Sequence, residues 1–136
     1  MTKLRVARTA FAILFLAVTY LTLAPNPDES APGFAAARWL AAALFGDEML
    51  GDKVAHFSAY GALGASAFLA AIRPFGRVWL APIALAAYGA LLEGAQGLGG
   101  VRTPELADAI SNAGGALAGF VLAMLAVRFA AKGTPT

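Results

Sequence analysis

The chain has 136 residues, of which 60% are hydrophobic and only 13% are charged. Soluble globular domains carry about 25% charged residues, so this composition excludes an ordinary soluble surface and predicts a small membrane protein. The absence of cysteine excludes disulfide and thiol chemistry. Although the net charge is +2, the basic residues are interpreted as topology signals and lipid contacts, and no nucleic-acid partner is expected.

Four apolar stretches are each close to the roughly 20 residues that cross a bilayer as a helix. They are Val6 to Ala24, Ala55 to Ile72, Val78 to Leu98 and Leu106 to Ala131. The sequence therefore predicts an all-α fold, a four-transmembrane-helix bundle. No long repeat or low-complexity linker divides the chain, so we expect a single domain over 1–136.

The first stretch could also be a secretory signal, because it follows a basic leader and ends in Thr22-Leu23-Ala24. Its apolar run is longer than that of a usual signal, and Pro25 directly after Ala24 makes a poor cleavage site. We therefore expect a retained membrane anchor.

The segment between the first and second spans is too long for a simple turn. Its three prolines at positions 25, 27 and 32 exclude a continuing helix, whereas Phe34 to Phe45 is apolar but too short to span. We expect an extracytoplasmic loop helix here. It either lies flat in the interface with Trp39, Leu40 and Phe45 in lipid, or caps the bundle, and the sequence leaves both open.

Charge distribution predicts the orientation. Seven of the ten basic residues lie in the leader, in the turn between the second and third spans, and in the tail; these are Lys3, Arg5, Arg8, Arg73, Arg77, Arg128 and Lys132. The positive-inside rule makes them cytoplasmic, so both termini are expected inside. The other three basic residues and all eight acidic residues then fall at the outer ends of the spans or in the outer loops.

Polar residues cluster where the second span begins. Asp52, His56 and Tyr60 follow one another at i to i+4 spacing, with Lys53 beside them, so one helical face presents the first three. At the outer end of the third span lie Glu93 and Gln96, and the small residues Ala86 and Gly89 continue their stripe. Small residues allow a neighbouring helix to approach closely.

The fourth span repeats this pattern with Asp108, Asn112, Gly115 and Gly119 on one face. Asp and Asn facing lipid would cost several kcal/mol, so the stripe is expected to face protein. The glycine pair is of the small-xxx-small type that lets helices pack tightly. Arg102 lies in the short loop before this span, and the three helix ends are predicted to form one outer polar pocket.

These residues resemble the VanZ-like family of small integral membrane proteins. The resemblance is carried by Asp52-Lys53-x-x-His56-x-x-x-Tyr60, Glu93-x-x-Gln96, Arg102, Asp108 and Asn112-x-x-Gly115, in that order and at similar spacing over about 52–119. It implies a four-helix protein of the bacterial cytoplasmic membrane. The family is named for a member linked to low-level resistance to the glycopeptide teicoplanin, and no established reaction comes with it.

A purely structural explanation competes with a binding site. Asp108 in a first helical turn is favoured by the helix macrodipole, and Lys53 could extend to the lipid headgroups. A lone histidine such as His56 is more often a hydrogen-bonded packing residue than a catalyst. Glu93 is harder to dismiss, because a carboxylate within a span is rare and usually paired or functional; with Arg102, Lys53 and His56 it could form an ion-pair network joining three helices.

The leading functional prediction is a site for an envelope molecule with a polar, anionic headgroup, approached from the outer leaflet. A lipid-linked cell-wall precursor or a phospholipid would fit. Arg102, Lys53 and Tyr60 would donate, while Glu93 and Asp108 would orient the cations and accept sugar or amide donors. The expected ligand-binding residues are Asp52, Lys53, His56, Tyr60, Glu93, Gln96, Arg102, Asp108 and Asn112. The sequence leaves open a homo-oligomer or a membrane partner protein.

An enzymatic alternative is a membrane-embedded hydrolase or transferase. His56 would be the base, oriented by Asp52 or Glu93, with water or Ser111 attacking. A single histidine and no cysteine argue against a standard zinc site, and no cofactor is expected, although His56, Glu93 and Asp108 could hold a divalent ion with open positions. Transport by a monomer is disfavoured, because no intramembrane charge appears on the cytoplasmic half and a full polar pathway is therefore missing.

Overall fold

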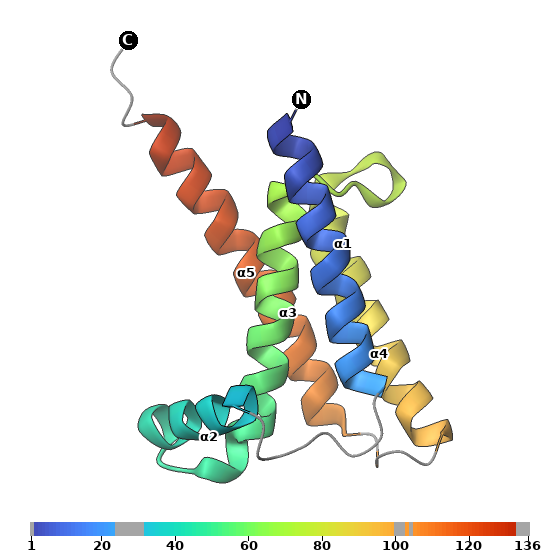
Figure 1. Cartoon of the computed structure of the whole chain (residues 1–136), viewed down its shortest axis with the longest axis vertical. Coiled ribbons are helices and arrows are strands. Elements are labelled where there is room, and N and C mark those ends of the chain that lie inside the picture. Colours follow the sequence, from blue (N-terminus) through green and yellow to red (C-terminus); the bar gives the residue numbers. More distant parts are fainter. Residues whose placement is uncertain (1, 24–31, 100–102, 104, 133–136) are drawn as a thin grey trace.

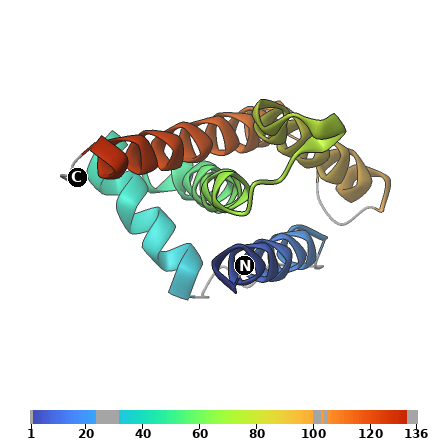
Figure 2. The same cartoon turned by 90° about the horizontal axis from the view of Figure 1, so that it is seen from above.

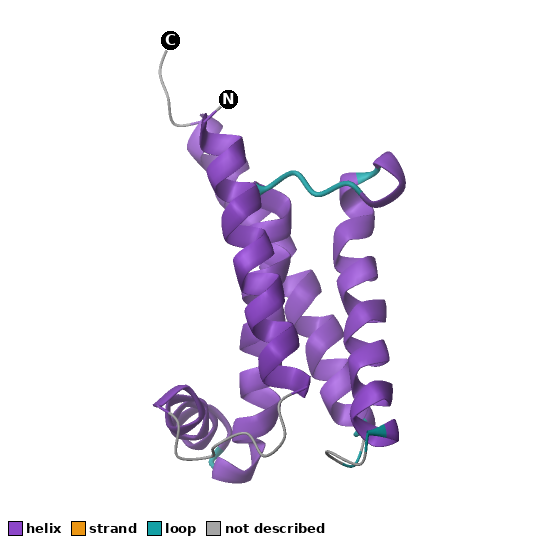
Figure 3. Cartoon of the chain, turned by 45° about the vertical axis from the view of Figure 1, so that its right-hand side comes forward, coloured by secondary structure: helices purple, strands orange, loops and turns teal. Residues whose placement is uncertain are grey.

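The computed structural model describes residues 2–23, 32–99, 103 and 105–132, and these residues form an all-α structure (Figure 3). Its five helices are α1 (Thr2–Leu23), α2 (Pro32–Phe45), α3 (Gly51–Leu69), α4 (Ala81–Leu98) and α5 (Leu106–Lys132). Three short 3₁₀ turns, Glu48–Leu50, Pro74–Gly76 and Val78–Leu80, complete the described elements. The predicted all-α class is confirmed.

Helix boundaries follow local signals. Gly46, with φ of 73°, follows α2 and closes it in a left-handed turn. Helix α3 ends three residues before the predicted Ile72, because Ala71 takes φ of 50° and the Ile72 amide donates to the carbonyl of Ala67 at 3.0 Å. This is a Schellman turn formed without glycine. The predicted end of the first span at Ala24 lies outside the described residues.

The long helices alternate in direction. In Figure 1, α1, α3, α4 and α5 run along the long axis, while α2 lies across one end of the molecule. The start of α1, the turns between α3 and α4, and the end of α5 lie at the opposite end. These three segments carry the seven basic residues predicted to share one side. The starts of α3 and α5 and the end of α4, which carry acidic residues, lie at the same end of the molecule as α2.

Helix α3 is the centre of the bundle and contacts each of the other four helices. Figure 2 shows α1 and α5 on opposite sides of it. Its closest neighbour is α5, because glycines bring the two backbones together: a Cβ on Gly119 would overlap the carbonyl of Gly61, and one on Gly115 would overlap the backbone of Phe57. The predicted close packing through this glycine pair is confirmed.

Three helical segments are long and apolar enough to cross a membrane, namely Thr2–Leu23, Val78–Leu98 and Leu106–Lys132. Their outward faces carry large apolar side chains, such as Leu16, Leu91 and Leu122, that are well exposed. This surface is that of a membrane protein. The predicted fourth span, α3, is not among the three, because its first two turns carry Asp52, Lys53 and His56.

Helix α2 packs on α3 through small residues. Ala37 and Ala41 are buried, while Trp39, Leu44 and Phe45 are exposed. At this contact a Cβ on Gly51 would overlap the Arg38 side chain. Arg38 also pairs with Glu48, at 3.1 Å from Nη2 to Oε2, which joins α2 to the turn that leads into α3.

Candidate functional site

Three helix ends deliver polar side chains to the end of the bundle beside α2. The first turns of α3 supply Asp52, Lys53, His56 and Tyr60, the last turns of α4 supply Glu93 and Gln96, and the start of α5 supplies Asp108 and Asn112. Eight of the nine residues predicted from the sequence therefore lie at this end. The ninth, Arg102, lies outside the described residues.

Lys53 is held by three carboxylates. Its Nζ lies 2.5 Å from Asp108 Oδ1, 2.6 Å from Glu105 Oε2 and 3.1 Å from Asp52 Oδ2. An ammonium has three donors, so all three are used within the protein. Partial burial lowers the pKa of Lys53, which precedes the apolar part of α3, but the hydrogen bonds to Asp108, Glu105 and Asp52 outweigh it and the pKa is raised. Lys53 is thus a charged tie between α3 and α5.

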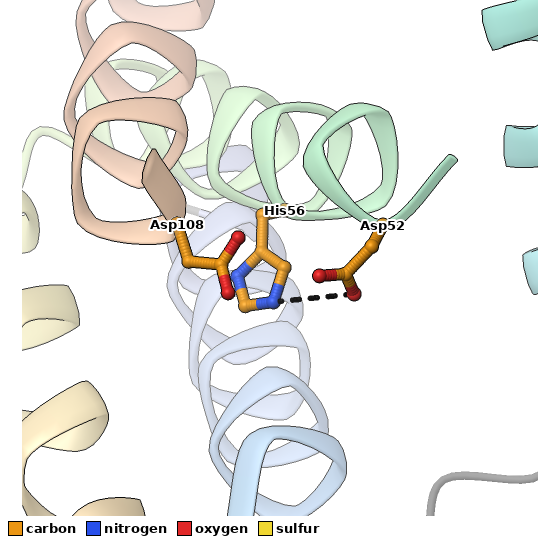
Figure 4. A group of neighbouring side chains, drawn as sticks. All are labelled: Asp52, His56 and Asp108. Atoms are coloured by element: carbon orange, nitrogen blue, oxygen red, sulfur yellow. Dashed lines mark ion pairs between the residues drawn. The ribbon is translucent and has the colours of Figure 1, made fainter. Parts of the chain in front are cut away.

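His56 lies between Asp52 of α3 and Asp108 of α5 (Figure 4), and Glu93 of α4 also approaches it. Its Nδ1 is 3.0 Å from Asn112 Oδ1, and since that amide oxygen only accepts, Nδ1 carries the proton. The other nitrogen, Nε2, lies 3.8 Å from Asp52 Oδ1. Glu93 Oε1 approaches the Nδ1 side at 3.8 Å. The imidazole is nearly buried, with 13% of its side chain exposed.

The small residues on α4 let side chains of α3 and α5 pack closely against it. A Cβ on Gly89 would lie 3.0 Å from both Tyr60 Cε1 and Asn112 Cβ. Gly89 is therefore the surface on which side chains of α3 and α5 meet α4. The sequence stripe predicted this close approach.

Buried polar atoms without partners gather in this cluster. Tyr60 Oη, Gln96 Oε1, Asp108 Oδ2 and Asn112 Nδ2 have no hydrogen-bond partner among the described residues. Tyr60 is 1% exposed, and Asp108 and Asn112 are fully buried. Such atoms are rare in folded proteins because leaving one unpaired costs about 1–3 kcal/mol. All four atoms lie at the same end of the bundle, in the predicted polar cluster.

The cluster is acidic. It contains four carboxylates, on Asp52, Glu93, Glu105 and Asp108, against the single ammonium of Lys53. Burial of unbalanced charge is unfavourable, so the described part of the cluster favours cations and hydrogen-bond donors.

One group in the cluster has the composition of a metal site. One donor atom from each of Asp52, His56 and Asp108 lies within 4.8 Å of the other two (Figure 4). The sequence pointed instead to His56, Glu93 and Asp108. In the structure the third member of this group is Asp52 rather than Glu93, because Glu93 approaches His56 Nδ1, which already forms a hydrogen bond with Asn112.

Sequence reasoning missed several partners. Glu105, three residues before Asp108, pairs with Lys53; this i to i+3 spacing at a helix start was the available signal. Gln96 donates to the carbonyl of Thr22, joining α4 to the end of α1, and Tyr88 Oη lies 2.8 Å from Thr19 Oγ1. No local pattern signals either of these two contacts.

Ser111, whose hydroxyl was a predicted attacking group, donates a hydrogen bond to the carbonyl of Ala107 in its own helix at 2.8 Å.

An apolar hollow of about 270 Å³ lies elsewhere, between α1, α3 and α4, with Phe11, Phe15, Leu85 and Tyr88 in its walls. It offers few groups to a polar ligand, so the chemistry of the molecule is concentrated in the acidic cluster.

Fold and site together define a small all-α membrane protein whose helices bury an acidic, histidine-containing cluster at one end of the bundle. Comparison of the chain with family models, with curated proteins and with solved structures gives no match.

Proposed function

We propose that this chain is a multi-pass protein of the bacterial cytoplasmic membrane that binds the polar headgroup of an envelope lipid or lipid-linked cell-wall precursor. The observation that carries the proposal is the gathering of buried, unpartnered polar atoms on Tyr60, Gln96, Asp108 and Asn112. The VanZ-like resemblance over about 52–119 supports an envelope role and a contribution to teicoplanin resistance.

In this proposal α3 is a fourth span and both termini are cytoplasmic. The polar residues of α3 face α4 and α5 rather than lipid, which removes the main cost of placing them in a membrane. Helix α2 lies in the outer interface, because its alanines pack on α3 and its exposed Trp39, Leu44 and Phe45 are left for lipid. The seven basic residues at the other end of the bundle then face the cytoplasm.

The charge balance refines the kind of headgroup. Lys53 is fully engaged by carboxylates, so it is poorly placed to hold an anion as the sequence suggested. Glu105 is the rim of the cluster, with 49% of its side chain exposed. We propose that the headgroup enters past Glu105 and is held through its hydroxyl, amide or ammonium donors, which pair with carboxylates and with Asn112 and Gln96.

Native mass spectrometry of the detergent-purified protein, with co-purifying lipids identified, tests the proposal. Glu93→Gln and Asp108→Asn change the buried cluster, and Glu48→Gln is the matched control, because Glu48 is an exposed carboxylate paired with Arg38 at the same end. We expect one headgroup class on the wild type and on Glu48→Gln, and its loss from both site variants. Unselective lipid on all four proteins would contradict the proposal and leave an ion-pair network that only joins helices.

A second candidate is a membrane-embedded hydrolase or transferase acting on the same headgroup. It is favoured by His56, whose Nδ1 donates to Asn112 while Nε2 faces Asp52, the orientation of a general base. Purified protein in liposomes of bacterial lipids would then change the lipid profile over time, and Glu93→Gln or His56→Gln would stop the change at full expression. An unchanged profile with the wild type contradicts this candidate but not binding.

A further inference from the structure

We infer that Asp52, His56 and Asp108 form a binding site for a divalent transition-metal ion such as Mn²⁺ or Zn²⁺. The inference does not depend on headgroup binding, because it concerns the ion alone. Two carboxylate oxygens and one imidazole nitrogen from two helices lie within 4.8 Å of one another. A metal held at about 2.1 Å from each donor needs donors about 3 to 3.4 Å apart, so the three side chains would close around the ion.

The imidazole is already oriented as a ligand. Metal-binding histidines usually donate their other ring N–H to a carbonyl or carboxylate, which fixes the tautomer and the plane of the ring. Here Nδ1–H donates to Asn112 Oδ1 at 3.0 Å. The lone pair of Nε2 is therefore left on the side of Asp52, whose Oδ1 lies 3.8 Å away.

The two carboxylates are held by an outer contact as well. Lys53 contacts Asp52 through Oδ2 and Asp108 through Oδ1, so it uses a different oxygen of Asp52 from the one that faces His56. Hydrogen bonds to ligating carboxylates of this kind orient them for the metal. Lys53 thus positions the ligands and does not have to leave when the ion binds.

An independent observation points to a missing partner at this place. Asp108 is fully buried, and its second oxygen, Oδ2, has no hydrogen-bond partner among the described residues. Figure 4 shows its carboxylate turned toward the His56 ring. The cluster also carries more carboxylates than cations, and a divalent ion would offset that surplus.

The donor set favours one class of metal. Mg²⁺ and Ca²⁺ prefer oxygen ligands alone, whereas an imidazole nitrogen suits Fe²⁺ or Zn²⁺ and the two carboxylates also suit Mn²⁺. Three protein ligands leave coordination positions open, as in catalytic rather than structural sites. Water or an oxygen of a bound molecule could occupy them.

The test is metal binding to the full chain in detergent after treatment with a chelator. Mn²⁺, Zn²⁺ and Mg²⁺ are titrated separately by calorimetry into the wild type, Asp52→Asn, His56→Gln, Asp108→Asn and the control Glu48→Gln. We expect one ion of Mn²⁺ or Zn²⁺ per chain, weaker Mg²⁺ binding, and a Kd at least about tenfold higher in each site variant than in the control. Asp52→Asn and His56→Gln alter partly exposed side chains, so they remain informative if Asp108→Asn does not fold.

A spectroscopic readout separates the proposed site from weak association with surface carboxylates. Electron spin-echo measurements on the Mn²⁺-loaded wild type should show coupling to an imidazole ¹⁴N, and His56→Gln should lose it. Absence of stoichiometric binding of either transition metal overturns the inference. Binding that persists unchanged in Asp52→Asn and His56→Gln, or Mn²⁺ without nitrogen coupling, overturns it equally.

Discussion

The contact between α3 and α5 gives the sharpest prediction, because two neighbouring glycines of α5 face it differently. A Cβ on Gly115 would overlap the backbone of Phe57, whereas a Cβ on Gly114 would lie at an ordinary 3.5 Å from the Phe57 ring. Gly115→Ala and Gly114→Ala therefore add the same methyl group to the same helix at adjacent positions. Only the first forces the two helices apart.

The expected magnitudes follow from two opposing effects. Replacing a helical glycine by alanine stabilises the helix by about 1 kcal/mol, while overpacking a tight contact typically costs about 1–3 kcal/mol. The overlap at Gly115 is with backbone, which cannot rotate away, so the upper part of that range applies. We expect Gly115→Ala to lower the free energy of unfolding by about 1–2 kcal/mol, and Gly114→Ala to raise it by up to about 1 kcal/mol.

Reversible unfolding in mixed micelles, with sodium dodecyl sulfate as the denaturant, measures this difference. Circular dichroism follows the helices and the fluorescence of the two tryptophans follows the tertiary structure. Equal shifts of the unfolding midpoint in the two variants would refute the reasoning, because helix propensity alone treats both positions alike.

Three further outcomes are expected from the same unfolding assay. Lys53→Met should lower the free energy of unfolding by about 3 kcal/mol, because it leaves the buried Asp108 unpaired. The double variant with Asp108→Asn should lose less stability than the two single variants together, and additive losses would contradict the pairing. Because the folded pKa of Lys53 is raised above 10.5, its contribution should be fully present below that pH and lost only on going more alkaline, so a cost that already falls between pH 7 and 9 would contradict the assignment. Gln96→Leu removes the hydrogen bond to the Thr22 carbonyl, and Tyr88→Phe removes the hydrogen bond to Thr19 of α1. Each should lower the free energy of unfolding by about 1 kcal/mol. In a separate hydrogen-exchange measurement, each should speed amide exchange in α1 but not in α5.

Periodicity was sufficient to predict most of this architecture. The i to i+4 spacing of Asp52, His56 and Tyr60 placed them on one face of α3, and Asp108 and Asn112 proved to be buried as their stripe required. The apolar stretches and the distribution of lysine and arginine also predicted the alternating helices. These are local patterns, because a helix repeats every 3.6 residues wherever it forms.

The features that were not predicted depend on how far apart two helices lie. Lys53 reaches Glu105 and Asp108 only because the glycines of α3 and α5 bring the helix starts together. The distance between two helices cannot be read from a single sequence. The left-handed helix end at Ala71 was not predicted, because such ends are usually recognised by a glycine and this one has alanine. The choice between Asp52 and Glu93 beside His56 also depends on the spacing between helices, so it had to come from the structure.

The central position of α3 has a consequence for how the chain enters a membrane. Charged residues weigh heavily against the insertion of an isolated helix, and α3 begins with Asp52 and Lys53 before a stretch rich in alanine, glycine and serine. Its shortest ion pair and its tightest backbone contacts are with α5, which is synthesised after it. In the proposed arrangement with α3 as a fourth span, α3 would thus have to wait during synthesis, at the insertion machinery or at the membrane surface, until α5 has emerged. The order in which these helices enter the bilayer would then differ from their order in the sequence, and the acidic cluster would be completed only once α5 has entered.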